Sequence, residues 1–432
     1  MVATVARVTL WGHTVGALAQ QPDASIAFEY DPQWLARGIE ISPLRLPARP
    51  GIFQFPGLNP ETFRGLPGAF ADTLPDDFGN AVINAWLERQ GIPREDFGTL
   101  DRLLYTGSRG MGALEYHPAK RLSDDRGEDI QLDSLLQVAQ DILDQRAKLG
   151  VKLSEASALK SILQVGTSAG GARPKAIVAI NEDRTRIRSG QVDAPKGFTH
   201  YLLKFDGVME HRTDQETFGD PQGFGRMEYA YSLMATDAGI TMEPCELLEE
   251  GNRAHFLTRR FDRDGNDKLH YQSLCAIDHA DYKKPGHYSY EELFTTARRL
   301  RLSRTEAIQL YRRMVFNVMA RNHDDHTKNF GFLLDGPAAR WRLAPAFDVA
   351  YSYKPGSPWV NSHQLSLNGK REQFTVDDLL AVAGQIGEFK TEARRVIEEI
   401  SDIVARWPKY AEQAQVPASL AKEIQSNLRL FS

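Results

Sequence analysis

The sequence predicts an α+β fold with two lobes, the first rich in strands and the second all-helical, preceded by a small α+β accessory subdomain. Residues 4–30 alternate in the manner of antiparallel strands, and apolar strand-like runs return at 176–180 and 199–205. Beyond residue 288 apolar side chains recur at helical spacing. A chain of 432 residues exceeds what one hydrophobic core usually serves. We therefore expect an accessory subdomain at 1–120, a β-rich lobe at 145–265 and a helical lobe at 266–432.

The composition is that of an ordinary globular protein, with 42% apolar and 25% charged residues. A net charge of -5 gives no general attraction to nucleic acid or anionic membranes. Cys245 and Cys275 show neither metal-ligand spacing nor a disulfide framework, which suits a reducing compartment. A cationic leader with a long apolar core and an apolar run of eighteen residues are both missing from the sequence. We expect a cytoplasmic protein that does not bind membranes.

The first 120 residues predict a small antiparallel sheet followed by two helices. Strands are expected at 5–10, 14–18 and 26–30, and helices at 81–87, after Asp76-Asp77-Phe78, and at 97–104. The glycines of TGSRGMGAL at 106–114 have two interpretations, a phosphate cradle or a turn before a strand. They match no strict fingerprint, so the turn is favoured.

A helix at 130–143 leads to a glycine-rich segment, 166–172, that precedes Lys175 and the strand at 176–180. Glycines let the backbone come within hydrogen-bonding distance of a phosphate, and the neighbouring hydroxyls add donors. A flexible loop without a ligand is the alternative for any one such segment.

Lys204 lies inside the apolar run THYLLKF, where a buried lysine needs an anion nearby. It either meets the phosphates of a nucleotide or has a structural role, by snorkelling or pairing. Glu228, in a helix ended by Gly239, is its candidate partner, the alternative being a solvated helix carboxylate. Residues 255–261 and 268–275 predict a hairpin around RDGND, which lacks the later ligands of a Ca²⁺ loop.

The last third of the chain predicts a mostly helical unit. Thr375, followed by Asp377 and Asp378, is expected to cap one of these helices at its N-terminus. The helices are expected at 290–300, 304–321, 375–386, 390–407 and 418–430.

The segment 321–348 contains the candidate catalytic and metal-binding residues. Asp324 is followed five positions later by Asn329, the spacing of the protein-kinase catalytic loop, in which the Asp takes up the substrate hydroxyl proton and the Asn ligates Mg²⁺. A hairpin of strands 330–334 and 340–343 around Asp335-Gly336 would return Asp348 to Asn329, where its carboxylate can hold Mg²⁺. A solvated polar loop rich in Asp, Asn and His is the alternative. The pattern predicts a protein-kinase-like fold, although no glycine follows Asp348 as in ordinary kinases.

Five motifs in order resemble the HipA family, the Ser/Thr-kinase toxins of bacterial type II toxin-antitoxin modules. They are SAGGARPK (168–175), THYLLKF (199–205), RRFDR (259–263), DDHTKN (324–329) and LAPAFD (343–348). VGAL, FEYDPQWL and LPGAFADTLPDDFG resemble the accessory domain of the same family. The resemblance covers most of the chain.

The resemblance implies ATP and Mg²⁺ as cofactors and assigns roles by position. Asp324 is the catalytic Asp and Lys328 stabilises the transferring phosphoryl group. Asn329 and Asp348 hold Mg²⁺, and Ser168 is the site of autophosphorylation, with Thr167 as an alternative acceptor. The cofactor-binding residues are Lys204, Lys175, Gly170, Gly171, the backbone around Arg259 and Phe261, and His326, which also fixes the shape of the loop. Arg173-Pro174 replaces the Gln-Glu of the family's glycine-rich loop.

The resemblance alone also implies the partners. These are a HipB-like helix-turn-helix antitoxin, DNA only indirectly through that antitoxin, and a protein substrate such as an aminoacyl-tRNA synthetase. Two other functions stay open, a nucleotide-binding pseudokinase that assists repression and a small-molecule kinase, because fold does not fix the acceptor. The intact set of Lys204, Asp324, Asn329 and Asp348 favours an active protein kinase over a scaffold.

Overall fold

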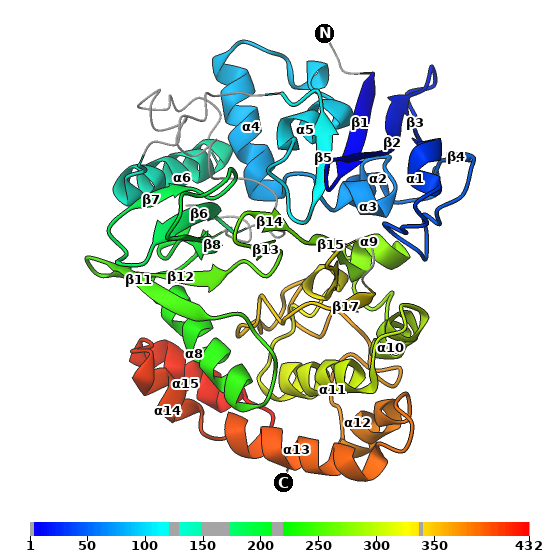
Figure 1. Cartoon of the computed structure of the whole chain (residues 1–432). Coiled ribbons are helices and arrows are strands. Elements are labelled where there is room, and N and C mark those ends of the chain that lie inside the picture. Colours follow the sequence, from blue (N-terminus) through cyan, green and yellow to red (C-terminus); the bar gives the residue numbers. More distant parts are fainter. Residues whose placement is uncertain (1–3, 121–128, 148–172, 210–218, 337–339, 432) are drawn as a thin grey trace. The chain divides into compact units, whose positions relative to one another are not determined.

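The computed structural model describes residues 4–120, 129–147, 173–209, 219–336 and 340–431. The chain forms two compact units (Figure 1). Unit 1 comprises residues 1–42, 46–225 and 246–271, and unit 2 comprises residues 43–45, 226–245 and 272–432.

The N-terminal part of unit 1 is an antiparallel sheet in the order β4-β3-β2-β1-β5, in which β1, β2 and β3 are the strands that the alternating sequence predicted. Its strands are β1 (Val5–Leu10), β2 (His13–Gln20), β3 (Ile26–Tyr30), β4 (Ile52–Phe53) and β5 (Leu114–His117). The accompanying helices are α1 (Pro32–Leu35), α2 (Pro60–Phe63), α3 (Gly68–Ala71), α4 (Asp77–Arg89), η1 (Arg94–Asp96) and α5 (Thr99–Thr106). Asp76 caps α4 by accepting a hydrogen bond from Gly79 N. The glycines of 106–114 precede β5, as the favoured turn interpretation required.

The second sheet of unit 1 has the order β11-β12-β8-β6-β7. Its strands are β6 (Lys175–Asn181), β7 (Ile187–Ser189), β8 (Phe198–Lys204), β11 (Cys245–Glu250) and β12 (Arg253–Arg259). The helix α6 (Leu132–Ala147) packs its apolar face on this sheet, with Leu135 and Val138 in one core with Val178 and Leu203. The described part of the unit also contains two short ribbons, β9 (Val208–Met209) with β10 (Gly219–Asp220) and β13 (Arg263–Asp264) with β14 (Asp267–Lys268).

The predicted hairpin of 255–261 with 268–275 is wrong in its pairing. Only the residues next to the turn pair, Arg263 with Lys268 and Asp264 with Asp267. β12 instead pairs with β8, and Leu274 and Cys275 begin a helix. The turn was predicted correctly because it depends on local residues. The pairing was predicted wrongly because the strand that pairs with β12 lies far away in the sequence.

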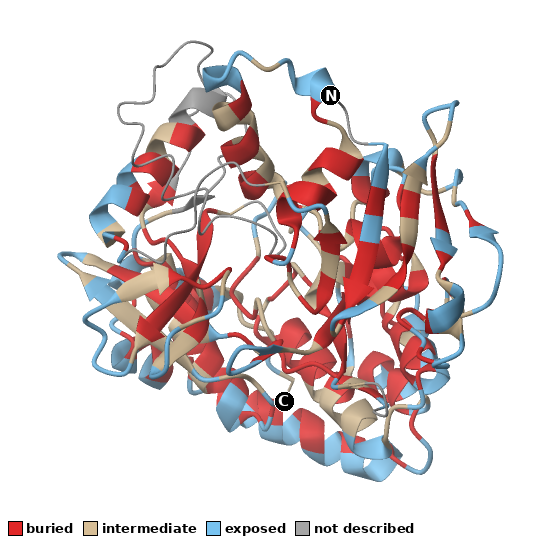
Figure 2. Ribbon diagram, turned by 45° about the horizontal axis from the view of Figure 1, so that its top comes forward, coloured by how far each residue is buried: buried red, intermediate tan, exposed pale blue. Residues whose placement is uncertain are grey.

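Unit 2 is mainly helical but not all-helical, which corrects the expectation for residues 266–432. A three-stranded sheet has the order β15-β16-β17. Its strands are β15 (His270–Ser273), of which the last two residues belong to unit 2, β16 (Gly331–Leu334) and β17 (Trp341–Leu343). The helices are α8 (Phe224–Asp237), α9 (Leu274–Asp278), α10 (Tyr290–Arg299), α11 (Arg304–Met319), η2 (Thr327–Asn329), α12 (Val376–Ala383), α13 (Lys390–Val404), α14 (Trp407–Gln413) and α15 (Ala418–Asn427). Figure 2 shows buried and exposed residues alternating along helices, as amphipathic sequences require.

Capping and proline explain where these helices begin and end. Thr375 caps α12, as predicted, by accepting a hydrogen bond from Asp378 N at 3.3 Å. The helix predicted over 390–407 ends at Val404, and a separate helix, α14, starts at Trp407. Pro408 has no N–H to donate to the preceding turn, so the helix breaks there. Across the described ranges, no helix combines the length and apolar character needed to cross a membrane.

Candidate active site

The candidate catalytic loop begins where α11 ends. A capping box of Ser303 and Glu306 starts α11, and its apolar face is buried from Leu310 to Met319. The loop then pairs with a distant segment, because Ser352 N donates to Arg321 O at 3.0 Å and His323 N donates to Ser352 O at 3.1 Å. The residues just before Asp324 are thereby held against the residues just after Asp348.

The predicted hairpin between Asn329 and Asp348 is present. β16 and β17 pair antiparallel with Phe332 opposite Leu343, and Ala344 N donates to Gly331 O at 2.9 Å. The returning segment is fixed further by Arg313 on α11, whose Nη2 donates to Ala344 O at 2.7 Å. Asp348 itself has a φ of +56°, in the left-handed region that Asp tolerates better than most residues. The hairpin thus carries the chain back to the loop.

Asn329 and Asp348 line the same small cavity in unit 2. Its volume is about 20 Å³, and Asn317, Asn322 and Asp325 also line it. Asn329 Nδ2 donates to Asp324 O at 2.7 Å, so its amide oxygen is the atom left to face a ligand. An amide oxygen and a carboxylate are oxygen donors of the kind that Mg²⁺ prefers. The donor set therefore fits Mg²⁺.

The remaining predicted loop residues lie around Asp324. The Asp324 side chain is 39% exposed, and its Oδ1 is 3.7 Å from His326 Nε2. The His326 ring packs edge-on against Tyr282 at 5.4 Å, and Lys328 Nζ lies 4.9 Å from the centre of the same Tyr282 ring. Asp324 is thus open to a substrate, while Tyr282 supports the two flanking residues.

Asp325 is the residue that the sequence reasoning missed. Its carboxylate is buried and accepts hydrogen bonds from the Tyr290 hydroxyl at 2.7 Å, from His363 Nδ1 at 2.8 Å and from Gln364 N at 2.7 Å. Burial raises the pKa of the Tyr290 hydroxyl well above its ordinary value, so the hydroxyl stays protonated and donates. Asp325 therefore fastens the loop to α10 and to the segment around residue 364. The doublet Asp324-Asp325 was the signal in the sequence.

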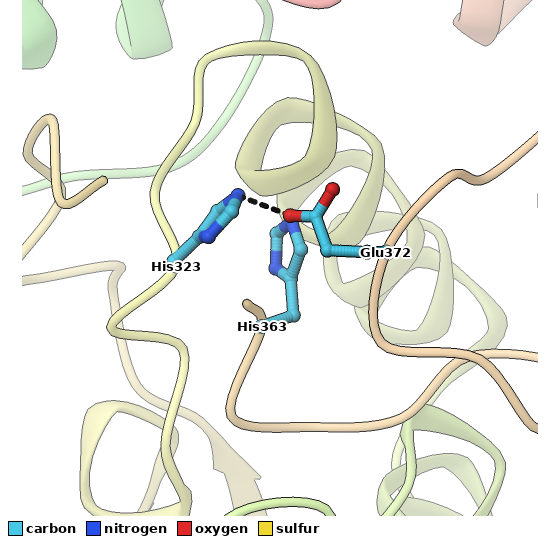
Figure 3. Close-up of side chains that lie close together, drawn as sticks. All are labelled: His323, His363 and Glu372. Carbon is cyan, nitrogen blue, oxygen red and sulfur yellow. Dashed lines mark ion pairs between the residues drawn. The ribbon is translucent and has the colours of Figure 1, made fainter. Parts of the chain in front are cut away.

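His323 precedes Asp324 and belongs to a second cluster, with His363 and Glu372 (Figure 3). His323 Nε2 lies 3.1 Å from Glu372 Oε1, and the rings of His323 and His363 are 4.2 Å apart. Burial, together with His363 and Arg321, lowers the pKa of His323 to about 2. The His323 imidazole is consequently neutral at pH 7.

Lys204 and Lys175 lie in unit 1 on adjacent strands. Both are buried, and they are opposite each other in the β6–β8 register. Lys175 Nζ is 3.4 Å from Asp76 Oδ2, at the N-terminus of α4. Burial raises the pKa of the Asp76 carboxyl more than Lys175 lowers it. The positive charges of Lys175 and Lys204 repel each other unless an anion lies nearby, and the Asp76 carboxylate is one such anion.

The other predicted cofactor residues differ in how the structure places them. Arg259 is exposed at the end of β12, and the Phe261 ring lies 5.3 Å from Tyr271. Glu228 in α8 is buried, so the solvated alternative for it is wrong. Ser168, Thr167, Gly170 and Gly171 lie outside the described residues.

Fold and site together define a mixed α/β protein with several sheets, whose helical unit brings an Asp-x-x-x-x-Asn loop and a later Asp to one cavity. The chain belongs to the HipA family. Its residues 6–117 match the HipA N-terminal domain, and residues 167–407 match the HipA-like C-terminal domain.

Two individual proteins are also similar to this chain. A protein of Sinorhizobium fredii (strain NBRC 101917 / NGR234) named "Putative kinase Y4mE" is 26% identical over 368 residues, which cover 80% of this chain and 77% of the relative. The fold is similar to that of a chain in the Shewanella oneidensis MR-1 toxin-antitoxin complex of HipA, HipB and operator DNA, with a TM-score of 0.63. That match covers 98% of this chain and 95% of the other at 15% identity, so it describes the fold alone.

Proposed function

We propose that this protein is an ATP- and Mg²⁺-dependent protein Ser/Thr kinase that acts as the toxin of a toxin-antitoxin module. One observation carries the proposal: in a HipA-family chain, Asn329 and Asp348 line one cavity beside the loop that starts at Asp324. The name of the Sinorhizobium relative also supports a kinase. The similar Shewanella structure is a toxin-antitoxin complex of HipA, HipB and operator DNA, which supports the toxin-antitoxin setting.

In this proposal the residues of unit 2 divide the work of phosphoryl transfer. Asp324, partly exposed, accepts the proton of the substrate hydroxyl while that oxygen bonds to the γ-phosphorus of ATP and the bond to the β-phosphate oxygen breaks. Asn329 and Asp348 would hold Mg²⁺, which neutralises charge on the phosphates. Lys328 stabilises the transferring phosphoryl group, and His326 shapes the loop beside Asp324.

The residues of unit 1 would bind the nucleotide. Lys204 is a buried cation on a strand, which suits contact with a phosphate. Lys175 and the loop with Gly170 and Gly171 would assist it, and the backbone around Arg259 and Phe261 would meet adenine. Ser168 is the proposed site of autophosphorylation. We assign residues 1–120 to the accessory subdomain, 145–265 to the nucleotide-binding lobe and 266–432 to the catalytic lobe of a kinase-like fold.

The proposal includes two protein partners. One is a HipB-like helix-turn-helix antitoxin, through which the protein would contact DNA only indirectly, and the HipB and operator DNA of the Shewanella complex support it. The other is a protein substrate of the translation machinery, with an aminoacyl-tRNA synthetase as the first candidate.

Incubation of the purified protein with γ-labelled ATP, Mg²⁺ and a bacterial lysate tests this function. We expect label on a small set of proteins, identified by mass spectrometry as phosphoserine or phosphothreonine. The matched control is Asp324→Asn, which keeps the size of the side chain and removes the proton acceptor. Label transferred equally by the control, or ATP binding without any transfer by the wild type, would contradict the proposal.

A further inference from the structure

A second cluster of potential metal ligands lies in unit 2, at residues that take no part in the proposed transfer of phosphate. His323, His363 and Glu372, here called the His-Glu cluster, each offer one ligand atom, and these atoms lie within 4.8 Å of one another. Figure 3 shows both rings turned toward the Glu372 carboxylate. The two histidines are buried, whereas the Glu372 side chain is 28% exposed. The cluster is therefore enclosed on one side and reachable from the other.

Each histidine of the cluster is oriented by a hydrogen bond from its other ring nitrogen. His323 Nδ1 donates to Val360 O at 3.2 Å, and His363 Nδ1 donates to the carboxylate of Asp325 at 2.8 Å. A carbonyl oxygen or a carboxylate on the far nitrogen is the arrangement that holds a metal-ligating histidine in place and raises its basicity. Since Nδ1 of each ring makes these bonds, Nε2 is the nitrogen that can bind an ion at the centre of the cluster.

Three hydrogen-bond acceptors lie at the centre of the His-Glu cluster. When Nδ1 is the donor on each ring, the two Nε2 atoms and Glu372 Oε1 are all acceptors. Arg321 Nη1 donates to two of these acceptors, because it lies 3.3 Å from His323 Nε2 and 3.1 Å from Glu372 Oε1. Among the hydrogen bonds of the described residues, none ends on His363 Nε2. A cation at the centre would satisfy all three acceptors at once.

We propose that the His-Glu cluster binds a zinc ion. Two imidazole nitrogens and one carboxylate form a donor set found in zinc sites, and they do not suit Mg²⁺, which prefers oxygen. Bonds of ~2.0–2.2 Å in a tetrahedral site set the ligand atoms about 3.4 Å apart, so two ligand atoms at the 4.8 Å limit would have to close by about 1.4 Å. The partly exposed Glu372 side chain can move toward the two rings, and water takes the fourth position.

Charges around the cluster set the strength of binding. Arg321 and Arg429 both pair with Glu372, the latter at 3.5 Å, and they oppose a dication. The Asp325 carboxylate behind His363 offsets one of these charges. Zinc would displace Arg321 Nη1 from His323 Nε2 and leave it on the second oxygen of Glu372, 3.2 Å away. We therefore expect reversible binding, weaker than that of a structural zinc site.

Zinc in this position would join two parts of the candidate active site. His323 directly precedes Asp324, whereas His363 and Glu372 lie in the chain that follows Asp348. A bound ion would fix the loop relative to that chain, so zinc would change the rate of phosphoryl transfer. Binding of the ion itself does not depend on the proposed kinase function.

The test is a zinc titration of the full-length protein after treatment with a chelator, followed by calorimetry and by thermal unfolding. We expect one zinc ion per chain at micromolar concentration and a rise in Tm with zinc, because a ligand that binds only the folded state stabilises it. Glu372→Gln and His363→Gln should lose more affinity than the ~10–100-fold typical for loss of an outer-shell partner, and Asp325→Asn should lose about that amount. His287→Gln, at an exposed histidine, is the matched control and should bind as the wild type does.

Three results would overturn the zinc site. The first is a wild-type protein without stoichiometric binding, and the second is a folded Glu372→Gln that binds zinc as tightly as the wild type. The third is loss of binding in Asp348→Asn with normal binding in Glu372→Gln, which would place the ion at the Mg²⁺ candidate residues. Because Glu372 is partly exposed, its variant should fold even where His363→Gln does not.

Discussion

Replacing Asp325 by asparagine should slow phosphoryl transfer without removing ATP binding. The carboxylate accepts three short hydrogen bonds from Tyr290, His363 and Gln364, and asparagine keeps only one acceptor oxygen. Hydrogen bonds to a charged group contribute about 1.5–3 kcal/mol each, so the loss of two such bonds predicts a loss of roughly 3–6 kcal/mol of stability, less whatever the Tyr290 hydroxyl recovers by rotating. A displacement of the loop by about 1 Å then lowers kcat by about 100-fold.

The assay compares kcat, the KM for ATP and the urea midpoint of the wild type and the variant. The matched control is Asp378→Asn, another buried carboxylate, which accepts hydrogen bonds from Lys370, Asn368 and Thr375 at the start of α12. The control should lose stability and keep kcat. A folded Asp325→Asn with wild-type kcat, or an equal loss of kcat in Asp378→Asn, would refute the role of Asp325 in positioning the loop.

Three further predictions concern other parts of the chain. Lys204→Ala should weaken ATP binding and slow transfer together, because it removes a buried cation from a strand, and wild-type kinetics in the folded variant would make Lys204 structural. Burial lowers the pKa of His270 to about 4, whereas an unfolded histidine has a pKa of ~6.5. As the pH falls below ~6.5 the unfolded state therefore binds a proton before the folded state does. The free energy of unfolding should drop by about 2 kcal/mol between pH 7 and 5. Urea unfolding of His270→Gln should show a smaller drop in the free energy of unfolding over this pH range. The same pH dependence in the variant and the wild type would contradict the lowered pKa of His270. Mass spectrometry after incubation with Mg²⁺-ATP should find phosphate on Ser168, or on Thr167, only when Asp324 is intact; the added charge of about -1.5 to -2 should lower ATP affinity, and unchanged affinity would remove its inhibitory role.

Elements with strong local patterns were predictable from the sequence. The alternation before residue 30, the buried strand β8 and the hairpin β16–β17 all occur where the residues indicated them. The hairpin was the step that mattered for the site, because it returns Asp348 to the cavity that Asn329 also lines. A turn signal between two apolar runs was enough to predict it.

Features that depend on distant partners were not predictable. The donors to Asp325 lie 35, 38 and 39 residues away in sequence, and no local pattern announces them. The same reason explains the wrong partner for β12, which pairs with β8 some fifty residues earlier. In contrast, the break between α13 and α14 was readable in principle from Pro408.

The central claim is that Asp348 holds the metal while Asp324 handles the acceptor hydroxyl. The most direct measurement is calorimetric binding of ATP with Mg²⁺ to Asp348→Ala and to Asp324→Asn, with transfer of label measured on the same preparations. We expect Asp348→Ala to lose Mg²⁺-dependent ATP binding, and Asp324→Asn to bind ATP almost normally and transfer no phosphate. The reverse pattern, in which Asp324→Asn loses ATP and Asp348→Ala keeps it, would contradict the assignment.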